Sequence, residues 1–440
     1  GEFNTALANE QDFLATRIAY KLNLRGPSIT VSTACSTSLV AIAEASKALN
    51  AFDCDLALAG GVSISTPLRS GYLYQEGGML SQDGHCRPFY AAATGTTYND
   101  VIGVVALKRT EDAIADGDCI YAIVRGFAVN NDGGNKVSFT APSVEGQAAA
   151  ISSAIEFADI DPATIGLIEA HGTATPLGDP VEVAALSKAF RGVEARKNCA
   201  IGSAKSNVGH LVHAAGVAGF IKAVLSVRDG VIPPTLFFEN ENEKLGLADT
   251  PFYVPTERSS WPETAVPRRA GISSFGVGGT NAHVIVEQPP AVGHGSMSGD
   301  DGQIICLSAR SPEALERHCH QLAEWSGNVT DVPIESIART LQCGREPMDE
   351  RVAWIAASSD QLDSRRIDRS SVFRGSVDDS RQVGFMFSGQ GAQRIGMGRG
   401  LREHVPEFRK WWDLGARILK ESRNIDLNSI LFEDKDESPG

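Results

Sequence analysis

The sequence predicts an α/β fold with a buried sheet across residues 28–288. Short β-branched runs alternate there with stretches of helical periodicity, and 42% hydrophobic with 21% charged residues is ordinary for a globular protein. The length of 440 residues suggests two to four domains. The predicted strands are SITVST, DLALAGGVSI, YAIVRGFAV, IGLIEA, CAIGSA, RRAGIS and AHVIVEQ. The predicted helices span residues 37–49, 144–157, 180–190 and 211–228.

A stretch rich in Gly, Pro, Ser and Asp at residues 289–303 predicts a boundary after this region. Beyond it, residues 311–325 begin with a serine cap and predict a helix, and residues 351–358 predict a strand. These two elements predict a small α/β linker module between residues 304 and 380. The stretch VGFMFSGQGAQRIGMG then predicts a strand, a glycine-rich turn and a helix, but too few residues follow for a domain of usual size.

Composition excludes several classes of protein. No apolar run approaches the ~18 residues that a membrane span needs, and the first residues lack the pattern of a secretory signal. A net charge of −14 lacks the electrostatic footprint of a nucleic-acid binder. The eight cysteines are scattered without any C-x-x-C pair, which predicts reduced thiols in the cytoplasm and no metal site.

Cys35, in the stretch VSTACSTSLV, is the first candidate for chemistry. It lies between a predicted strand that ends at Thr33 and a predicted helix that begins near Thr37. Unpaired amides and the dipole at a helix N-terminus favour a thiolate, and a stabilisation of ~2 kcal/mol would bring a thiol pKa from ~8.5 to near 7. Free cysteine also packs as a small buried hydrophobe. The residue alone therefore leaves both a nucleophile and a buried filler open.

Two histidines and a lysine occupy similar positions. His171 directly follows the predicted strand IGLIEA, and Lys205 and His210 follow the predicted strand CAIGSA on a loop with Gly and Asn. Ligands bind at strand ends in open α/β sheets, so we expect these side chains and Cys35 to converge. A lone loop histidine is more often structural, so the shared placement is what carries this hypothesis.

Other polar residues carry weaker signals. His213 could imitate a metal pair with His210, but no third ligand is nearby, and a surface position is favoured. His85 and Cys86 are interpreted as residues that structure a loop. Glu182 is as much a first-turn partner of the helix dipole as a chemical group.

Four long motifs, TACSTSLVA, EAHGTATPLGDPVE, KSNVGHLVHAAGVAG and SSFGVGGTNAHVIVEQ, resemble in order and spacing the β-ketoacyl synthase domain of modular type I polyketide synthases. FMFSGQGAQRIGMG resembles the opening of the acyltransferase domain that follows in such enzymes. The resemblance implies a thiolase-like layered fold and a homodimer in the full-length synthase. It divides the chain into a β-ketoacyl synthase lacking its N-terminal part (1–288), the ketosynthase-acyltransferase linker (289–380) and a truncated acyltransferase segment (381–440).

The implied reaction is a decarboxylative Claisen condensation. By this match Cys35 takes the growing acyl chain from the phosphopantetheine of an acyl carrier protein, and no cofactor is bound directly. His171 and His210 hold the malonyl thioester and stabilise its enolate, supported by Lys205. Two neutral imidazole donors suit this task because they stabilise negative charge without supplying a proton that would quench the carbanion.

The same match implies roles for further residues. The backbone amides of Cys35 and Val277 form the oxyanion hole, and Thr173 and Thr175 bind the pantetheine arm. Gln390 matches an oxyanion-hole residue of the acyltransferase, but the G-H-S-x-G nucleophile motif of that domain does not occur in the chain. The expectation is a fragment of a larger synthase that carries all three condensing residues, and whose activity in isolation is not predicted.

Four positions depart from the family pattern. Tyr90 stands where Asp is usual, and Asn99 and Val101 stand where glycines are usual. If those turns need a positive φ, Val101 would introduce strain on the order of 1 to 2 kcal/mol. Val277 stands where related synthases often carry a bulkier gate residue, which predicts a wider acyl channel.

Three alternatives compete with this interpretation. The glycines of GVGG and GQGAQ lack the complete pattern of a nucleotide-binding loop. A papain-type hydrolase would need one histidine with an Asn or Asp to orient it, and the second histidine argues against that class. A catalytically inactive scaffold for dimerisation and carrier-protein docking remains the alternative, because a fold does not by itself establish activity.

Overall fold

A computed structural model describes residues 2–67, 70–134, 136–290, 302–327, 332–377, 386, 389, 391–392 and 394–432. The chain divides into two compact units, Gly1–His294 and Gly295–Gly440, and each is described by itself. No helix among the described residues is long and apolar enough to cross a membrane.

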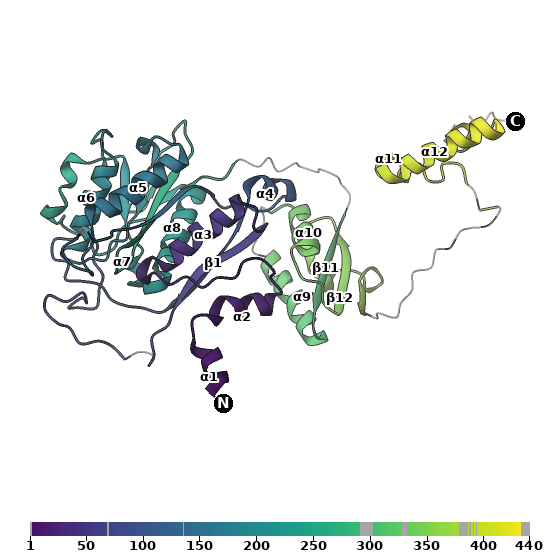
Figure 1. Cartoon of the computed structure of the whole chain (residues 1–440). Helices are drawn as coiled ribbons and strands as arrows, with labels where there is room; N and C mark the ends of the chain where they lie inside the picture. The colour runs from purple at the N-terminus through teal and green to yellow at the C-terminus, as the bar shows by residue number, and fades with distance from the viewer. Residues whose placement is uncertain are drawn as a thin grey trace. The chain divides into compact units, whose positions relative to one another are not determined.

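A six-stranded sheet forms the centre of the first unit (Figure 1). Its spatial order is β3 (Ile123–Asn131), β10 (Thr280–Glu287), β9 (Arg269–Phe275), β4 (Leu167–Glu169), β5 (Cys199–Gly202) and β7 (Phe252–Tyr253). β10 runs antiparallel to both of its neighbours, whereas β9, β4, β5 and β7 run parallel to one another. The parallel strands are short and buried, as expected for strands covered by helices on both faces.

Two pairs of helices cover this sheet (Figure 1). α3 (Thr37–Asn50) and α8 (Ala215–Asp229) lie on one face, and α5 (Val144–Ala158) and α6 (Gly178–Ala189) lie on the other. Each pair buries its own hydrophobic cluster against the strands. The sheet is therefore the middle of three layers.

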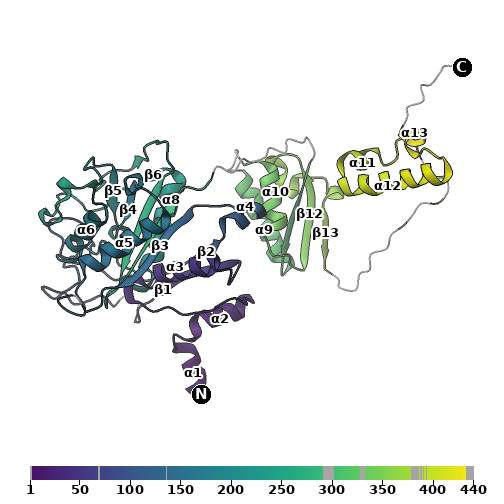
Figure 2. The same cartoon turned by 45° about the horizontal axis from the view of Figure 1, so that its top comes forward.

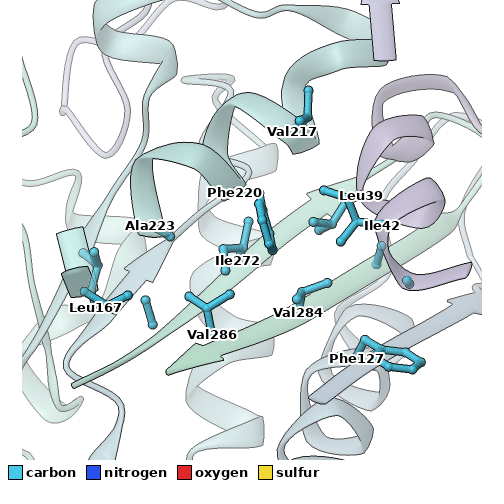
Figure 3. Close-up of a cluster of buried hydrophobic side chains, with 14 of the residues drawn as sticks. Leu39, Ile42, Phe127, Leu167, Val217, Phe220, Ala223, Ile272, Val284 and Val286 are labelled. Atoms are coloured by element: carbon cyan, nitrogen blue, oxygen red, sulfur yellow. The ribbon is translucent and has the colours of Figure 1, made fainter. Parts of the chain in front are cut away.

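The cluster beneath α3 and α8 fixes how these two helices sit (Figure 3). Figure 3 shows Leu39 and Ile42 from α3 beside Phe220 from α8, above Ile272 and Val284 of the sheet. All five side chains are buried, and burial of each is worth about 1.5 to 3 kcal/mol. Both helices are thus held on the same patch of sheet, close to the start of α3.

The remaining elements of the first unit are shorter. They are the antiparallel pair β1 (Leu56–Ser63) and β2 (Val101–Lys108), the pair β6 (Val231–Ile232) and β8 (Ser259–Ser260), and the helices α1 (Glu2–Asn9), α2 (Phe13–Leu22), α4 (Thr110–Asp116) and α7 (Lys205–Val208). β1 packs against α3, and β2 contacts the short turn Val212–Ala214 that precedes α8. Just before β2, Tyr98 forms an isolated β-bridge with His210.

The second unit contains a three-stranded antiparallel sheet of β11 (Gln303–Ala309), β12 (Glu350–Ala356) and β13 (Phe373–Ser376). α9 (Pro312–Ser326) and α10 (Ile334–Cys343) lie against it around the buried Trp354 (Figure 2). The Oγ of Ser311 accepts a hydrogen bond from the amide of Ala314 at 3.3 Å, so Ser311 is the helix cap that the sequence predicts. The described residues near the C-terminus form α11 (Arg399–His404), α12 (Pro406–Arg423) and α13 (Leu427–Phe432).

The predicted α/β class is confirmed, and so are six of the seven predicted strands of residues 28–288. The exception is SITVST, which forms no strand. The amide of Thr33, at the end of this segment, donates instead to the Oγ1 of Thr37 at 2.9 Å, and the Oγ1 of Thr30 accepts the amide of Ala15 at 3.4 Å. β2 was not predicted, and the helix expected from Leu211 begins instead as a short turn at Val212–Ala214.

Candidate active site

Four predicted residues converge in the first unit from three separate segments. Cys35 lies in the single turn Ala34–Ser36 before α3, His171 follows β4, and Lys205 opens α7 directly after β5. His210 lies between α7 and α8, and the rings of His171 and His210 are 5.4 Å apart and nearly perpendicular at 88°. β4 and β5 are parallel neighbours, so their carboxyl ends deliver both histidine loops to one edge of the sheet.

The turn around Cys35 aims the sulfur at the loop between β9 and β10. Ala34 has a left-handed backbone with φ of +53°, which makes the entry into α3 sharp. The Oγ of Ser274 donates to the carbonyl of Cys35 at 2.8 Å and ties the turn to β9. The backbone amides of Val277 and of Cys35 itself lie close enough to the sulfur to lower the pKa of the thiol. Two backbone N–H groups therefore lie beside the sulfur.

The pKa of Cys35 differs from the sequence-based expectation. Burial raises the pKa of its thiol above the ordinary value, and this outweighs the Lys205 charge and the two nearby backbone amides, which lower the pKa. The predicted fall to near 7 was wrong because it counted the helix terminus and omitted desolvation. Cys35 is only 9% exposed, so a buried resting thiol is the better description.

The hydrogen bonds of His210 define which of its nitrogens carries the proton. The amide of Val212 donates to Nδ1 of His210 at 3.2 Å, so Nδ1 is the acceptor and Nε2 carries the proton. Burial, together with the nearby positive charge of Lys205, lowers the pKa of His210 to about 3. His210 is therefore a neutral N–H donor at physiological pH.

His171 is neutral for similar reasons. Burial, then the charges of Lys205 and His210, hold the pKa of His171 well below its usual value. Its Nδ1 is buried and has no hydrogen-bond partner among the residues that the structure describes. A second neutral imidazole with one free nitrogen thus faces His210 across the site.

Two buried carboxylates hold the His171 loop, and sequence reasoning did not find their task. Glu182 accepts the amides of His171 at 2.7 Å and Gly172 at 2.8 Å. Asp179 accepts the amides of Phe89 at 2.8 Å and of Ala174 at 3.0 Å.

Burial raises the pKa of Asp179 to about 6 and that of Glu182 to about 7. Glu182 was left as either a dipole partner or a chemical group, and it proves to position the backbone of His171. The spacing D-P-V-E was the available signal, since residues three apart share a helix face.

The two threonines of the same loop lie next to each other. The Oγ1 atoms of Thr173 and Thr175 are 3.2 Å apart, and that of Thr175 also accepts the amide of Gly178 at 3.0 Å. Both side chains are partly exposed. Gln390 lies outside the described residues.

Comparison with known proteins gives this geometry a family. The models for the β-ketoacyl synthase N-terminal domain, C-terminal domain and C-terminal extension match residues 2–113, 121–239 and 242–351. The solved ketosynthase from module 1 of the bacillaene synthase of Bacillus amyloliquefaciens is 38% identical, with a TM-score of 0.77 over 85% of this chain and 68% of that one. The chain belongs to the β-ketoacyl synthase family. The resemblance predicted from the four motifs is confirmed.

Further relatives support the same assignment. The ketosynthase from module 6 of the bacillaene synthase of Bacillus subtilis is 35% identical, with a TM-score of 0.75 over 97% of this chain and 73% of that one. A component protein of the phenolphthiocerol/phthiocerol polyketide synthase of Mycobacterium tuberculosis is 40% identical over 98% of this chain. The chain spans 30% of the length of that protein. The thiolase-like fold expected for a ketosynthase is thereby confirmed.

The departures from the family pattern introduce no left-handed backbone into this ketosynthase. Asn99 and Val101 are not among the residues with positive φ, and Val101 opens β2 by pairing with Ser63. The strain considered for Val101 is therefore absent. Asn99 instead ties down the His210 loop: its amide donates to the carbonyl of His210 at 3.1 Å, and its Nδ2 donates to that of Val208 at 2.7 Å.

His213 and Cys86 lie near the site without a proposed chemical role. His213 is partly buried and lies close enough to His210 to depress the pKa of that residue. Cys86 is buried beside Gly172, and burial raises the pKa of its thiol to about 11. The described residues contain no cluster of three or more His, Cys, Asp or Glu side chains suited to a metal ion.

The raised pKa of Cys35 predicts a pH dependence. The thiolate is the reactive form, so alkylation by iodoacetamide should still be accelerating at pH 9, when the cysteine of a short unstructured peptide with blocked ends, whose pKa is near 8.5, is already levelling off. The rate would be followed by mass spectrometry of the Cys35 peptide across pH 6 to 10. A plateau near pH 7 would instead support the depressed pKa inferred from the sequence.

Proposed function

We propose that this ketosynthase catalyses the decarboxylative Claisen condensation of a polyketide synthase, joining an acyl chain on Cys35 to a malonyl-type extender on an acyl carrier protein. Membership of the family places the chain among transferases. The observation that carries the finer proposal is the pair of neutral, perpendicular imidazoles of His171 and His210 beside a buried cysteine. Neutral N–H donors suit an enolate, whereas hydrolysis would need a basic imidazole.

The first step transfers the acyl chain. The sulfur of Cys35 attacks the thioester carbonyl, a new carbon–sulfur bond forms, and the bond to the pantetheine sulfur breaks. The proton of the Cys35 thiol passes to the leaving pantetheine thiolate. The amides of Cys35 and Val277, which lie close to the sulfur, would stabilise the oxyanion of the tetrahedral intermediate.

The second step forms the carbon–carbon bond. Loss of carbon dioxide from the malonyl thioester leaves an enolate, whose oxygen would accept hydrogen bonds from His171 and His210. The enolate carbon then attacks the acyl carbonyl, Cys35 leaves as a thiolate, and solvent reprotonates it. Lys205 would support both steps, since its charge helps to keep the imidazoles neutral and lowers the pKa of Cys35.

The substrates define the partners. Both reactants would arrive on the phosphopantetheine arm of an acyl carrier protein, and the adjacent hydroxyls of Thr173 and Thr175 are suited to bind that arm. We further propose a homodimer in the full-length synthase. Residues 381–440 remain predicted as the start of an acyltransferase, with Gln390 in its oxyanion hole.

Acyl labelling tests the proposal. Incubation of the chain with an acyl thioester of a carrier protein should place the acyl group on Cys35, found by mass spectrometry of the tryptic peptide. Cys35→Ser should move no label to the seven other cysteines. A folded chain whose Cys35 is alkylated by iodoacetamide but never acylated would favour the inactive scaffold, which no comparison or contact supports.

A further inference from the structure

The loop that carries the Val277 amide is fastened at several points. Within it, the amide of Gly279 donates to the carbonyl of Gly276 at 2.9 Å, and Gly276 pairs with Thr280 at 2.8 Å. From the end of β3, the amide of Asp132 donates to the carbonyl of Gly279 at 2.9 Å. The position of the Val277 donor therefore depends on the segment that follows β3.

A buried ion pair lies under this loop. The side chains of Asp132 and Lys136 are 1% and 5% exposed, and the Oδ2 of Asp132 lies 3.5 Å from the Nζ of Lys136. The Nδ2 of Asn281 in β10 donates to the other carboxylate oxygen of Asp132 at 2.7 Å. Among the described residues, Lys136 Nζ has no hydrogen-bond partner besides this ion pair. Asp132 is therefore the group that balances the positive charge of Lys136.

Gly279 lies directly against the pair. A Cβ at this residue would lie 2.7 Å from the Nζ of Lys136 and 2.9 Å from the Oδ2 of Asp132, and its φ is +92°. The ring of Phe139 would lie 3.4 Å from a Cβ at Gly278, and the centroid of this ring lies 5.7 Å from the Nζ of Lys136. Because Gly278 and Gly279 have no side chains, the backbone of the loop packs directly against Lys136 and Phe139.

We propose that the Asp132–Lys136 pair positions the Val277 amide against the sulfur of Cys35. Neither residue touches the sulfur, so both are positioning residues. A buried ion pair is seldom favourable for stability alone, and a backbone donor stabilises an oxyanion only when it is held in place beforehand. The inference rests on the proposed function, because it assigns the amide to acyl transfer.

Lys136→Met tests the proposal in the whole chain. Acylation of Cys35 by an acyl thioester should slow at least tenfold, because a misplaced donor loses part of the 10²- to 10³-fold effect of an oxyanion-hole hydrogen bond. Alkylation by iodoacetamide, which forms no oxyanion, should stay within twofold of wild type. Lys188→Met, which removes the exposed ion pair with Glu145, is the matched control and should change neither rate.

The outcomes separate this inference from the proposed function. Equal slowing of acylation and alkylation, or no slowing, would overturn the positioning role. If the wild-type chain is alkylated but never acylated, the proposed function fails, and hydrogen exchange of residues 275–281 still tests the pair. Exchange should be faster in Lys136→Met than in Lys188→Met, and equal exchange would overturn the inference.

Two glycine variants keep the test usable if Lys136→Met does not fold. Gly279→Ala and Gly192→Ala place alanine at nearly the same φ, +92° and +96°, but a Cβ at Gly192 meets nothing within 4 Å. Gly279→Ala should therefore lower the acylation rate and speed hydrogen exchange in the loop, and Gly192→Ala should do neither. Similar behaviour of the two variants would count against the proposal.

Discussion

Replacing His210 with alanine should slow the decarboxylation of a malonyl thioester by about 10²- to 10³-fold, while acylation of Cys35 stays within about threefold of wild type. His210 presents a protonated Nε2 because the Val212 amide occupies its Nδ1, so the variant loses one enolate donor of fixed direction. Acyl transfer relies instead on the backbone amides beside the sulfur. Carbon dioxide release from malonyl-carrier protein and acyl labelling of Cys35 measure the two steps separately.

His213→Ala is the matched control for this experiment. His213 lies three residues further on, in the short turn before α8, and has no role in the proposed steps. Its replacement should leave decarboxylation within about threefold of wild type, whereas His171→Ala should resemble His210→Ala. Equal loss of both steps in His210→Ala would contradict the division of roles between imidazoles and backbone amides.

The convergence of Cys35, His171 and His210 could be predicted because each of them interrupts a regular pattern at the same kind of place. His171 and Lys205 directly follow buried strands, and glycine stands next to both histidines at Gly172 and Gly209. The carboxyl ends of neighbouring parallel strands lie at the same edge of a sheet. Residues that follow such strands are therefore expected to lie close together. The wider motifs added the resemblance to the family.

The properties that depend on burial could not be predicted. The pKa of Cys35 comes from desolvation by segments distant in sequence. Neutral histidines were expected from the family resemblance, but their burial, which is the main cause, could not be derived from the sequence. The amide partners of Glu182 likewise appear only once α6 packs beneath the His171 loop. The role of Asn99 could not be predicted either. It stands where the family usually has glycine, and the hydrogen bond from its side chain to the carbonyl of Val208 holds the His210 loop.

The close packing of α3 against α8 places Cys35 near His210. The Oγ of Ser38, three residues after Cys35, accepts the amide of Val217 at 2.9 Å. Next to it, Gly216 lies so close to α3 that an added Cβ would be 2.7 Å from both the backbone nitrogen and the Cβ of Leu39. The segments that carry Cys35 and His210 are therefore in direct contact at Gly216, which has no side chain to separate them.

Gly216→Ala should therefore destabilise the first unit by roughly 1 to 3 kcal/mol, since the contact is with the backbone and Cβ of Leu39 and cannot be relieved by a side-chain rotation. Separation of the helices should also move Cys35 away from His210, so condensation should fall more than acyl labelling. Urea unfolding of the whole chain measures the stability, with hydrogen exchange of the α3 and α8 peptides assigning the loss to this unit.

Gly415→Ala in α12 provides a control of opposite sign. A Cβ at Gly415 meets nothing within 4 Å, so alanine should stabilise that helix by up to about 1 kcal/mol through its higher helix propensity. Both variants replace a helical glycine with alanine. At Gly216 a neighbouring helix occupies the space of the new Cβ, whereas at Gly415 that space is open. If Gly216→Ala proved as harmless as Gly415→Ala, the close contact with Leu39 could not be what holds Cys35 beside the histidines.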